Sequence, residues 1–346
     1  MKKKIISIVR NLIFLGIGIF LVYWQLGKMS DAQEEQFKES LLNAKYIYII
    51  PVIVMALLSH LSRAIRWRIL MEPMGYKPKV SNTFYAILCG YFANNFVPRA
   101  GEVLRCTLLS KYENIPVTKL IGTVLLERVF DFITYFFIIL ITFLIQVKTV
   151  SNFVNEKFTF VSGNNQTHWL KFAIILLVFF GVYLGIKFVF KKFNQKPFIQ
   201  KLISYWAGLK EGFTSIMHLK KRKLFLAHTI FMWSMYLLQI YIGFQALSQT
   251  AHLGIGAAFS VLTLSTLAMI VSPGGIGAFP VAVQQVLLIY SIENISFGWL
   301  MWAVSTGIIL IAGLISFGLI IYQNKKKNEE NPNHPRQNIA LGRSAP

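Results

Sequence analysis

The sequence predicts an all-α polytopic membrane protein with about six full transmembrane helices and two re-entrant, broken hairpins that enter from opposite faces. Hydrophobic residues make up 55% of the 346 residues and charged residues only 14%, and the mean hydropathy is +0.55. This balance is far from that of a soluble globular domain. The arrangement of the elements follows from the lengths of the apolar runs and from the distribution of basic residues between them.

Six apolar runs approach the roughly 20 residues that a helix needs to cross a bilayer. They occupy residues 5–26, 46–62, 120–147, 169–190, 224–248 and 297–322. The first run follows three lysines, as the apolar part of a secretory signal would. Because it has no small-residue cleavage site, we predict that it remains as the first helix. The acidic loop 27–45 is expected to form a short amphipathic helix at the outer surface.

Two shorter apolar stretches, at 83–97 and 255–271, run into turn-forming residues and then into more apolar sequence. The first is interrupted at Asn94–Glu102 and the second at Pro273–Pro280. With a cytoplasmic N-terminus, a single crossing at 83–97 would leave the basic residues that follow on the outside, against the positive-inside rule. A hairpin on the cytoplasmic face satisfies the rule. The same reasoning predicts that the second stretch is a hairpin from the outer face.

Charge also places the termini and divides the chain. Both ends are predicted to be cytoplasmic, in a bacterial inner membrane, because basic residues crowd the start of the chain and Lys325–Lys327. Residues 1–324 are expected to form one integral-membrane domain, and residues 325–346 a short, polar, disordered tail. The net charge of +21 lies in short segments between apolar runs, so it fixes topology and does not indicate nucleic-acid binding.

The first hairpin carries candidate substrate-binding residues at and beside its break. They are Asn94, Asn95, Pro98, Arg99, Gly101, Glu102 and Arg105. The asparagines supply amide donors and acceptors, and a guanidinium at Arg99 or Arg105 can hold a phosphodiester through two parallel hydrogen bonds. The alternative is that Arg99 and Glu102 neutralise each other while Arg105 extends to the interface.

The glycine-rich break of the second hairpin is another candidate binding segment. Its residues are Pro273, Gly274, Gly275 and Gly277. A turn of this kind exposes backbone N–H groups at the start of a helix, where they attract an anion. The alternative is structural, because a glycine-rich chain can bend tightly between packed helices.

Glu127, Arg128 and Asp131 form a third candidate, an intramembrane relay or ion pair. A rise of about 1.5 Å per residue places Glu127 about 10 Å beyond Leu120, inside a hydrocarbon core about 30 Å thick. Glu127 and Asp131 share a helix face, and Arg128 can pair with Asp131. The cluster is either a structural ion pair near the cytoplasmic end or a polar relay that contacts a headgroup in a cavity.

Basic and aromatic residues after the second span match an interfacial belt, which favours membrane anchoring over substrate capture. These residues are Arg63, Arg66, Trp67 and Arg68. The two aspartates, Asp31 and Asp131, cannot form a DxD pair, and the sequence has no clustered histidines and no Walker motif. We therefore expect no metal ion, no cofactor and no ATP-driven pump.

The motifs at 94–105 and 127–131, with the turn at 273–277, resemble the flippase-like, lysylphosphatidylglycerol synthase transmembrane-region family of bacterial and archaeal membrane proteins. The resemblance covers most of the chain, residues 5–322. It implies a membrane domain that translocates or handles polar lipids. In the larger synthases an aminoacyltransferase domain follows this region. Here a short polar tail follows instead, so lysyl transfer is not expected of this chain alone.

From these features we expect a lipid translocase, and not an enzyme, that moves or binds a polar, phosphate-bearing lipid at a midplane cavity. The expected partners are membrane lipids with an anionic or zwitterionic phospholipid or lipid-linked headgroup. Two other classes stay open. One is a secondary transporter or channel for a small solute, and the other is an integral-membrane lipid-modifying enzyme with Glu127 or Asp131 as general base. The sequence also leaves a homo-oligomer open.

Overall fold

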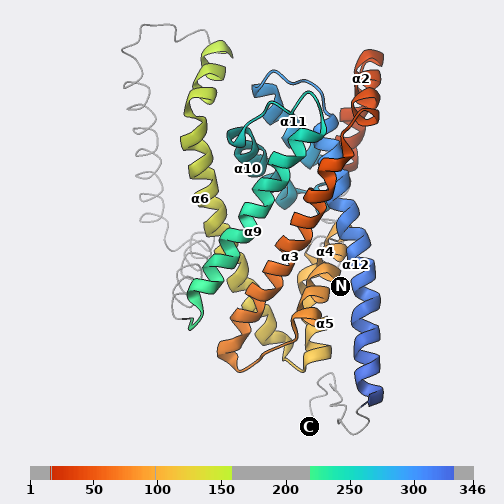
Figure 1. Ribbon diagram of the computed structural model, residues 1–346, viewed down its shortest axis with the longest axis vertical. Helices are drawn as coiled ribbons and strands as arrows, with labels where there is room; N and C mark the ends of the chain where they lie inside the picture. The colour runs from red at the N-terminus through yellow and green to blue at the C-terminus, as the bar shows by residue number, and fades with distance from the viewer. Residues whose placement is uncertain (1–15, 17, 98, 158–218, 331–346) are drawn as a thin grey trace, which may run out of the picture.

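The computed structural model describes residues 16, 18–97, 99–157 and 219–330 (Figure 1). All regular elements in these ranges are helical, which confirms the predicted class there. The helices are α2 (Asp31–Leu42), α3 (Ile49–Met71), α4 (Val80–Phe96), α5 (Ala100–Glu113), α6 (Val117–Lys157), α9 (Arg222–Gly243), α10 (Ile255–Val271), α11 (Ala278–Ile289) and α12 (Ser296–Glu330). Short 3-10 turns are η1 (Tyr46–Tyr48), η2 (Glu72–Met74), η4 (Phe244–Ala246) and η5 (Pro273–Gly275). Helical residues 18–26 precede α2.

Four segments among the described residues are long and apolar enough to cross a membrane. They are Tyr46–Met74, Val117–Gln146, Arg222–Ala246 and Ser296–Lys325. Each overlaps one of the six expected spans. The remaining two, 5–26 and 169–190, fall largely or wholly outside the described residues. Exposed phenylalanines and leucines along α6, such as Phe132 and Leu144, give this helix the apolar surface expected of a segment that faces lipid.

Several helix ends differ from the boundaries expected from apolar runs. Helix α3 continues from the expected end at residue 62 to Met71, and α6 continues from 147 to Lys157. Helix α12 extends to Glu330, so residues 325–330 of the expected disordered tail are helical. Polar residues ended the apolar pattern in each case, although the backbone hydrogen bonds of a helix do not require apolar side chains. The prediction for 331–346 lies outside the described residues.

The helix expected within the loop 27–45 is present as α2, and its first turn explains where it starts. The Ser30 side chain accepts a hydrogen bond from the Gln33 backbone, and the Gln33 side chain accepts one from the Ser30 backbone. This reciprocal pair is a capping box, which satisfies two backbone donors at the start of a helix. Helix α2 lies at one end of the molecule, and α5 lies near the other (Figure 1).

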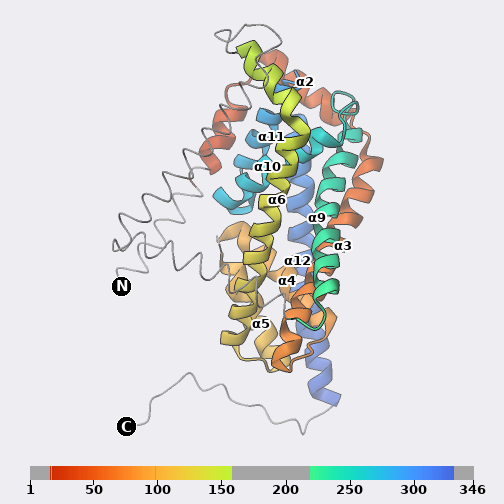
Figure 2. The ribbon, with the colours of Figure 1, turned by 90° about the vertical axis from the view of Figure 1, so that its left-hand side faces the viewer.

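Two helix pairs occupy opposite halves of the bundle. Helices α4 and α5 pack together in the half that also contains the end of α3, and α10 and α11 pack together in the half near α2 (Figure 2). Helices α3 and α9 lie side by side, and α12 runs along α4 (Figure 1). The long helices α3, α6, α9 and α12 therefore surround the α4–α5 and α10–α11 pairs, each of which is interrupted between its two helices.

The α4–α5 pair depends on close backbone approach. A Cβ atom at Gly101 would overlap the carbonyl oxygen of Gly90, so the two helices touch where neither residue has a side chain. The Gly101 N–H donates to Asn94 Oδ1 at 2.8 Å, which ties the end of α4 to the start of α5. Arg99 precedes α5 in the left-handed region, at φ 64°.

The α10–α11 break lies against the α4–α5 break. A Cβ atom at Gly274, whose φ is 58°, would overlap Oδ1 of Asn95, so the tips of the two pairs meet at these residues. Trp302 Nε1 donates to the Gly274 carbonyl at 2.9 Å and anchors the turn to α12. Gly277 lies against Gly18, so helical residues 18–26 cover the far side of this break.

Candidate functional site

Glu127 is the centre of a buried cluster of charged side chains. It lies on α6 with no exposed surface. Its Oε1 accepts hydrogen bonds from Arg63 Nη1 at 3.0 Å and Arg66 Nη2 at 2.9 Å, and its Oε2 accepts one from Arg105 Nη2 at 2.9 Å. Both carboxylate oxygens are therefore engaged, and the three arginines join α3 and α5 to α6.

Asp131 extends the cluster by one helical turn. Its Oδ2 lies 2.9 Å from Arg63 Nη1, and its Oδ1 lies 2.6 Å from Arg66 Nη2. Glu127 and Asp131 are four residues apart on α6, and Arg63 and Arg66 are three apart on α3, so each pair shares one helix face. Two acidic residues on one helix thus meet two arginines on the other along matching faces.

Aromatic rings line the guanidinium groups of the cluster. Trp67 lies 4.6 Å from Arg105, Phe225 lies 5.5 Å from Arg66, and Tyr91 lies 5.9 Å from Arg63. Trp67 is fully buried and donates through Nε1 to Thr123 at 2.8 Å. A cation over an aromatic face gains electrostatic attraction that grows when water is excluded. The aromatic rings therefore stabilise the buried guanidinium groups. The other apolar side chains around the cluster offer no such attraction.

The cluster carries more positive than negative charge. Three guanidinium groups face two carboxylates, which leaves a surplus of one positive charge among Arg63, Arg66, Arg105, Glu127 and Asp131. The Nε atoms of the three arginines are also buried and have no hydrogen-bond partner within the described ranges. A buried donor without an acceptor is costly. The cluster is therefore suited to attract an anion with several acceptor oxygens.

A second ion pair borders a small cavity next to the cluster. Arg128 Nη2 lies 2.7 Å from Glu102 Oε1, and both side chains are partly exposed. The cavity has a volume of about 10 Å³ and is lined by Ile87, Gly90, Tyr91, Asn94, Gly101, Glu102, Arg105 and Arg128. This volume holds about one water molecule. In this conformation α4, α5 and α6 pack closely around Arg105 and Arg128.

The structure distributes the predicted site residues over two neighbouring places. The cluster and its cavity bring together Asn94, Gly101, Glu102, Arg105, Glu127, Arg128 and Asp131. The glycine-rich turn meets Asn95 instead, and no hydrogen bond or ion pair in the described part of the chain links Pro273–Gly277 to the arginines. Arg99 is exposed and has no ion pair with a described residue. Pro98 lies outside the described residues.

The possible pairing of Arg128 with Asp131 and the alternative interpretation of the first hairpin are both wrong. Arg128 pairs with Glu102 and not with Asp131, Glu102 does not neutralise Arg99, and Arg105 is buried against Glu127 instead of extending to an interface. In each case the true partner belongs to another helix. Neighbours along one helix are evident from spacing, whereas partners across helices depend on how the helices pack.

The interfacial-belt interpretation is wrong for Arg63, Arg66 and Trp67, which are all buried. One signal in the sequence could have revealed them. The apolar pattern does not stop at Arg63, because Ile65, Ile69 and the residues after it continue the apolar face of α3 as far as Met71. Two acidic residues four apart inside another apolar run require basic partners. Arg63 and Arg66 are basic residues on such a continued apolar helix.

No group of three or more His, Cys, Asp or Glu side chains that could hold a metal ion occurs among the residues that the structure describes. The two cysteines, Cys89 and Cys106, are both buried and free. The chemistry of the cluster is therefore that of guanidinium and carboxylate groups enclosed by aromatic rings.

The long apolar helices and the charged cluster enclosed by them define a multi-pass helical membrane protein. Residues 11–313 match the family Lysylphosphatidylglycerol synthase TM region, and the chain belongs to this family. The resemblance drawn from the motifs is therefore confirmed.

Curated relatives share most of their length with this chain. A UPF0104 membrane protein of Methanocaldococcus jannaschii is 26% identical over 311 residues, which are 84% of this chain and 87% of the relative. A UPF0104 membrane protein of Pyrococcus horikoshii is 22% identical over 344 residues, 91% of this chain and 97% of the relative. No solved structure matches the chain.

Proposed function

We propose that this protein is a lipid translocase, which moves a polar, phosphate-bearing lipid between the two leaflets. The observation that carries the proposal is the surplus positive charge of the buried Arg63–Arg66–Arg105 cluster. Charged side chains inside a membrane are costly and mark substrate or ion pathways. A phosphodiester group would balance the surplus charge and accept hydrogen bonds from the unused guanidinium donors.

The α4–α5 and α10–α11 pairs are, in this proposal, re-entrant hairpins from opposite faces. Helices α4 and α10 have 17 residues each, which at about 1.5 Å per residue is about 26 Å, short of a hydrocarbon core about 30 Å thick. The contact between Asn95 and Gly274, where the two breaks lie against each other, supports this arrangement. Broken elements that meet near the midplane are typical of secondary transporters.

The headgroup would first meet Arg99, because its side chain is exposed at the α4–α5 break. It would then pass to Arg105 and Arg128 on the cavity between the two helices. A cavity of about 10 Å³ cannot hold a phosphate, so translocation requires α4 and α5 to move apart. The exposed apolar side chains of Phe96 and Val97 next to the break leave a path on which the acyl chains can stay in lipid.

In this scheme Glu127 and Asp131 hold the arginine side chains in position. Glu127 has both oxygens occupied by arginines, an arrangement that favours positioning of the guanidinium groups over general-base chemistry. The same positive surplus would also suit a small anionic solute. A lipid path leaves a lateral gap between helices, whereas a solute path is closed to lipid, so the position of bound lipid density discriminates the two.

Reconstitution tests the proposal. The protein is incorporated into vesicles that contain phospholipids labelled on the headgroup, and the label that reaches the opposite leaflet is measured by chemical quenching. We expect Arg99→Ala and Asp131→Asn each to lower the rate, while the exposed-charge control Lys223→Gln leaves it unchanged. Transport that survives both changes would remove the proposed mechanism, and vesicles without any protein-dependent transfer would remove the translocase itself.

A further inference from the structure

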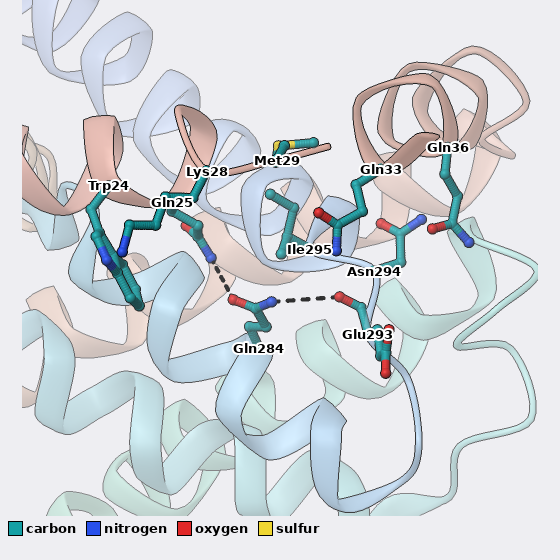
Figure 3. A pocket seen from close by; sticks show the side chains of 10 residues that line it. All are labelled: Trp24, Gln25, Lys28, Met29, Gln33, Gln36, Gln284, Glu293, Asn294 and Ile295. Carbon is teal, nitrogen blue, oxygen red and sulfur yellow. Dashed lines mark hydrogen bonds between the residues drawn. The ribbon is translucent and has the colours of Figure 1, made fainter. Parts of the chain in front are cut away.

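A larger cavity lies between helical residues 18–26, α2, and the end of α11 with the segment that follows it, and none of its lining residues belongs to the arginine cluster. Its volume is about 210 Å³, far above the roughly 10–15 Å³ that one water needs and below the roughly 300–1,000 Å³ of pockets for drug-sized ligands. It is lined by Trp24, Gln25, Lys28, Met29, Gln33, Gln36, Gln284, Glu293, Asn294 and Ile295 (Figure 3). The size suits one small ring or headgroup.

Carboxamide side chains from separate segments converge on this cavity. Gln25 comes from helical residues 18–26, Gln33 and Gln36 from α2, Gln284 from α11, and Asn294 from the segment between α11 and α12. Two of them form a chain of hydrogen bonds: Gln25 Nε2 donates to Gln284 Oε1 at 2.9 Å, and Gln284 Nε2 donates to the Glu293 carbonyl at 3.5 Å (Figure 3). Each amide has both donor and acceptor atoms.

Gln25 carries an acceptor that its surroundings leave unused. The residue is 7% exposed, and its Oε1 is buried with no hydrogen-bond partner in the described part of the chain. Buried polar atoms are nearly always paired, and an unpaired one is costly. Because Gln25 lines the cavity, a ligand there can supply the missing donor.

The charges and the aromatic ring of the cavity restrict the class of ligand. Lys28 and Glu293 contribute one charge of each sign, so the lining is neutral and does not select for an anion. Trp24 presents a large, partly exposed apolar ring, and Lys28 Nζ lies 5.5 Å from its centre. A neutral ligand that offers both an apolar face and several hydrogen-bonding groups matches this lining.

We propose that this cavity binds a neutral, hydroxyl-rich ring such as a sugar. A hydroxyl both donates and accepts, as a carboxamide does, so several hydroxyls can pair at once with the amide atoms of Gln25, Gln33 and Gln36 that have no partner among the described residues. One hydroxyl hydrogen satisfies Gln25 Oε1, and the apolar face of the ring packs on Trp24. The ring can belong to the headgroup of a glycolipid or to a free sugar. The site is separate from the arginine cluster and does not depend on the proposed translocase activity.

Binding to the purified full-length chain in lipid nanodiscs tests this proposal. The probes are a diglucosyl diacylglycerol, maltose, and phosphatidylglycerol as the anionic comparison, and affinity is measured by native mass spectrometry. We expect the glycolipid, or both sugar-bearing probes, to bind at least tenfold more tightly than phosphatidylglycerol. Gln25→Leu and Gln36→Leu should each weaken that binding by about tenfold, because a ligand hydroxyl then lacks its partner.

Two features keep the test decisive. Gln36 is exposed on α2, so Gln36→Leu removes an amide of the cavity without disturbing buried packing, and Gln323→Leu on α12 is the matched control outside the cavity. Binding of maltose as well as the glycolipid would show that the sugar alone is recognised, and binding of the glycolipid only would assign a lipid headgroup. Absence of binding to both sugars, or binding unchanged in both variants, overturns the proposal and leaves the arginine cluster untouched.

Discussion

Arg105 Nη2 and Glu127 Oε2 are 2.9 Å apart and join α5 to α6. This contact connects the helix that follows the first break to the acidic residue at the centre of the buried cluster. Because Glu127 also holds Arg63 and Arg66 of α3, a movement of α5 toward or away from α6 changes how many guanidinium groups the carboxylate balances. The position of α5 thus determines how far the positive charges of the cluster are balanced.

Glu127→Gln is expected to destabilise the protein strongly, by about 3–5 kcal/mol, because it leaves buried guanidinium groups without their counter-charge. Thermal unfolding in detergent measures the change. Glu102→Gln is the matched control, since Glu102 pairs with Arg128 at a partly exposed position, and an exposed pair is worth about 0–1 kcal/mol. Equal effects of the two changes would contradict the central role of Glu127.

Arg63→Gln and Asp131→Asn should not have additive effects on the free energy of unfolding. The two side chains lie 2.9 Å apart and are both buried, so a double-mutant cycle is expected to give a coupling energy of about 0.5–3 kcal/mol. The pair Lys221 and Glu72, which lies at a more exposed surface, should give no more than about 1 kcal/mol. A coupling energy near zero for the buried pair would argue against the contact.

Gly101→Ala should loosen the packing of α4 against α5. The added Cβ would overlap the Gly90 carbonyl, and overpacking of this kind costs about 1–3 kcal/mol or more. Gly122→Ala is the control, because a Cβ at Gly122 on α6 meets nothing within 4 Å, and alanine in an exposed helix stabilises by about 0.5–1 kcal/mol. Opposite signs of the change in unfolding free energy are expected, and matching signs would be evidence against the close approach.

Gly274→Ala should destabilise the contact between the two breaks. Gly274 has φ 58° and faces Asn95, so the new Cβ is both strained and obstructed. Gly75→Ala separates the two causes, because Gly75 also has positive φ but open space around it, and strain alone costs about 1–3 kcal/mol. In the Gly274→Ala background, Asn95→Ala is expected to recover the steric part of the loss in unfolding temperature. No recovery would mean that the tips do not touch.

Part of this fold could be predicted from the sequence because its signals are local. Apolar runs near the length of a bilayer crossing predicted the four described spans, and turn-forming residues in the sequence marked the breaks between α4 and α5 and at Pro273. Positions where a polar residue interrupts an apolar helix were missed, as at Arg63, since the pattern weakens there although the helix continues.

The partners within the site could not be predicted for a different reason. Arg63 and Glu127 are 64 residues apart in the chain, and only the packing of α3 against α6 brings them together. The acidic pair at Glu127 and Asp131 was found because its burial follows from position along a helix. The contact between Asn95 and Gly274 required the two broken pairs to be placed in space.

The two buried arginines of α3, Arg63 and Arg66, have a consequence for how the chain enters the membrane during synthesis. An arginine near the centre of a membrane helix opposes insertion by about 2.5–3.5 kcal/mol, and Arg63, near the middle of α3, reaches the membrane 64 residues before its acidic partner Glu127. Helix α3 is therefore poorly suited to leave the insertion machinery alone. Its stable release into lipid should wait for α6, which makes these two helices a unit of biogenesis although α4 and α5 separate them in the chain.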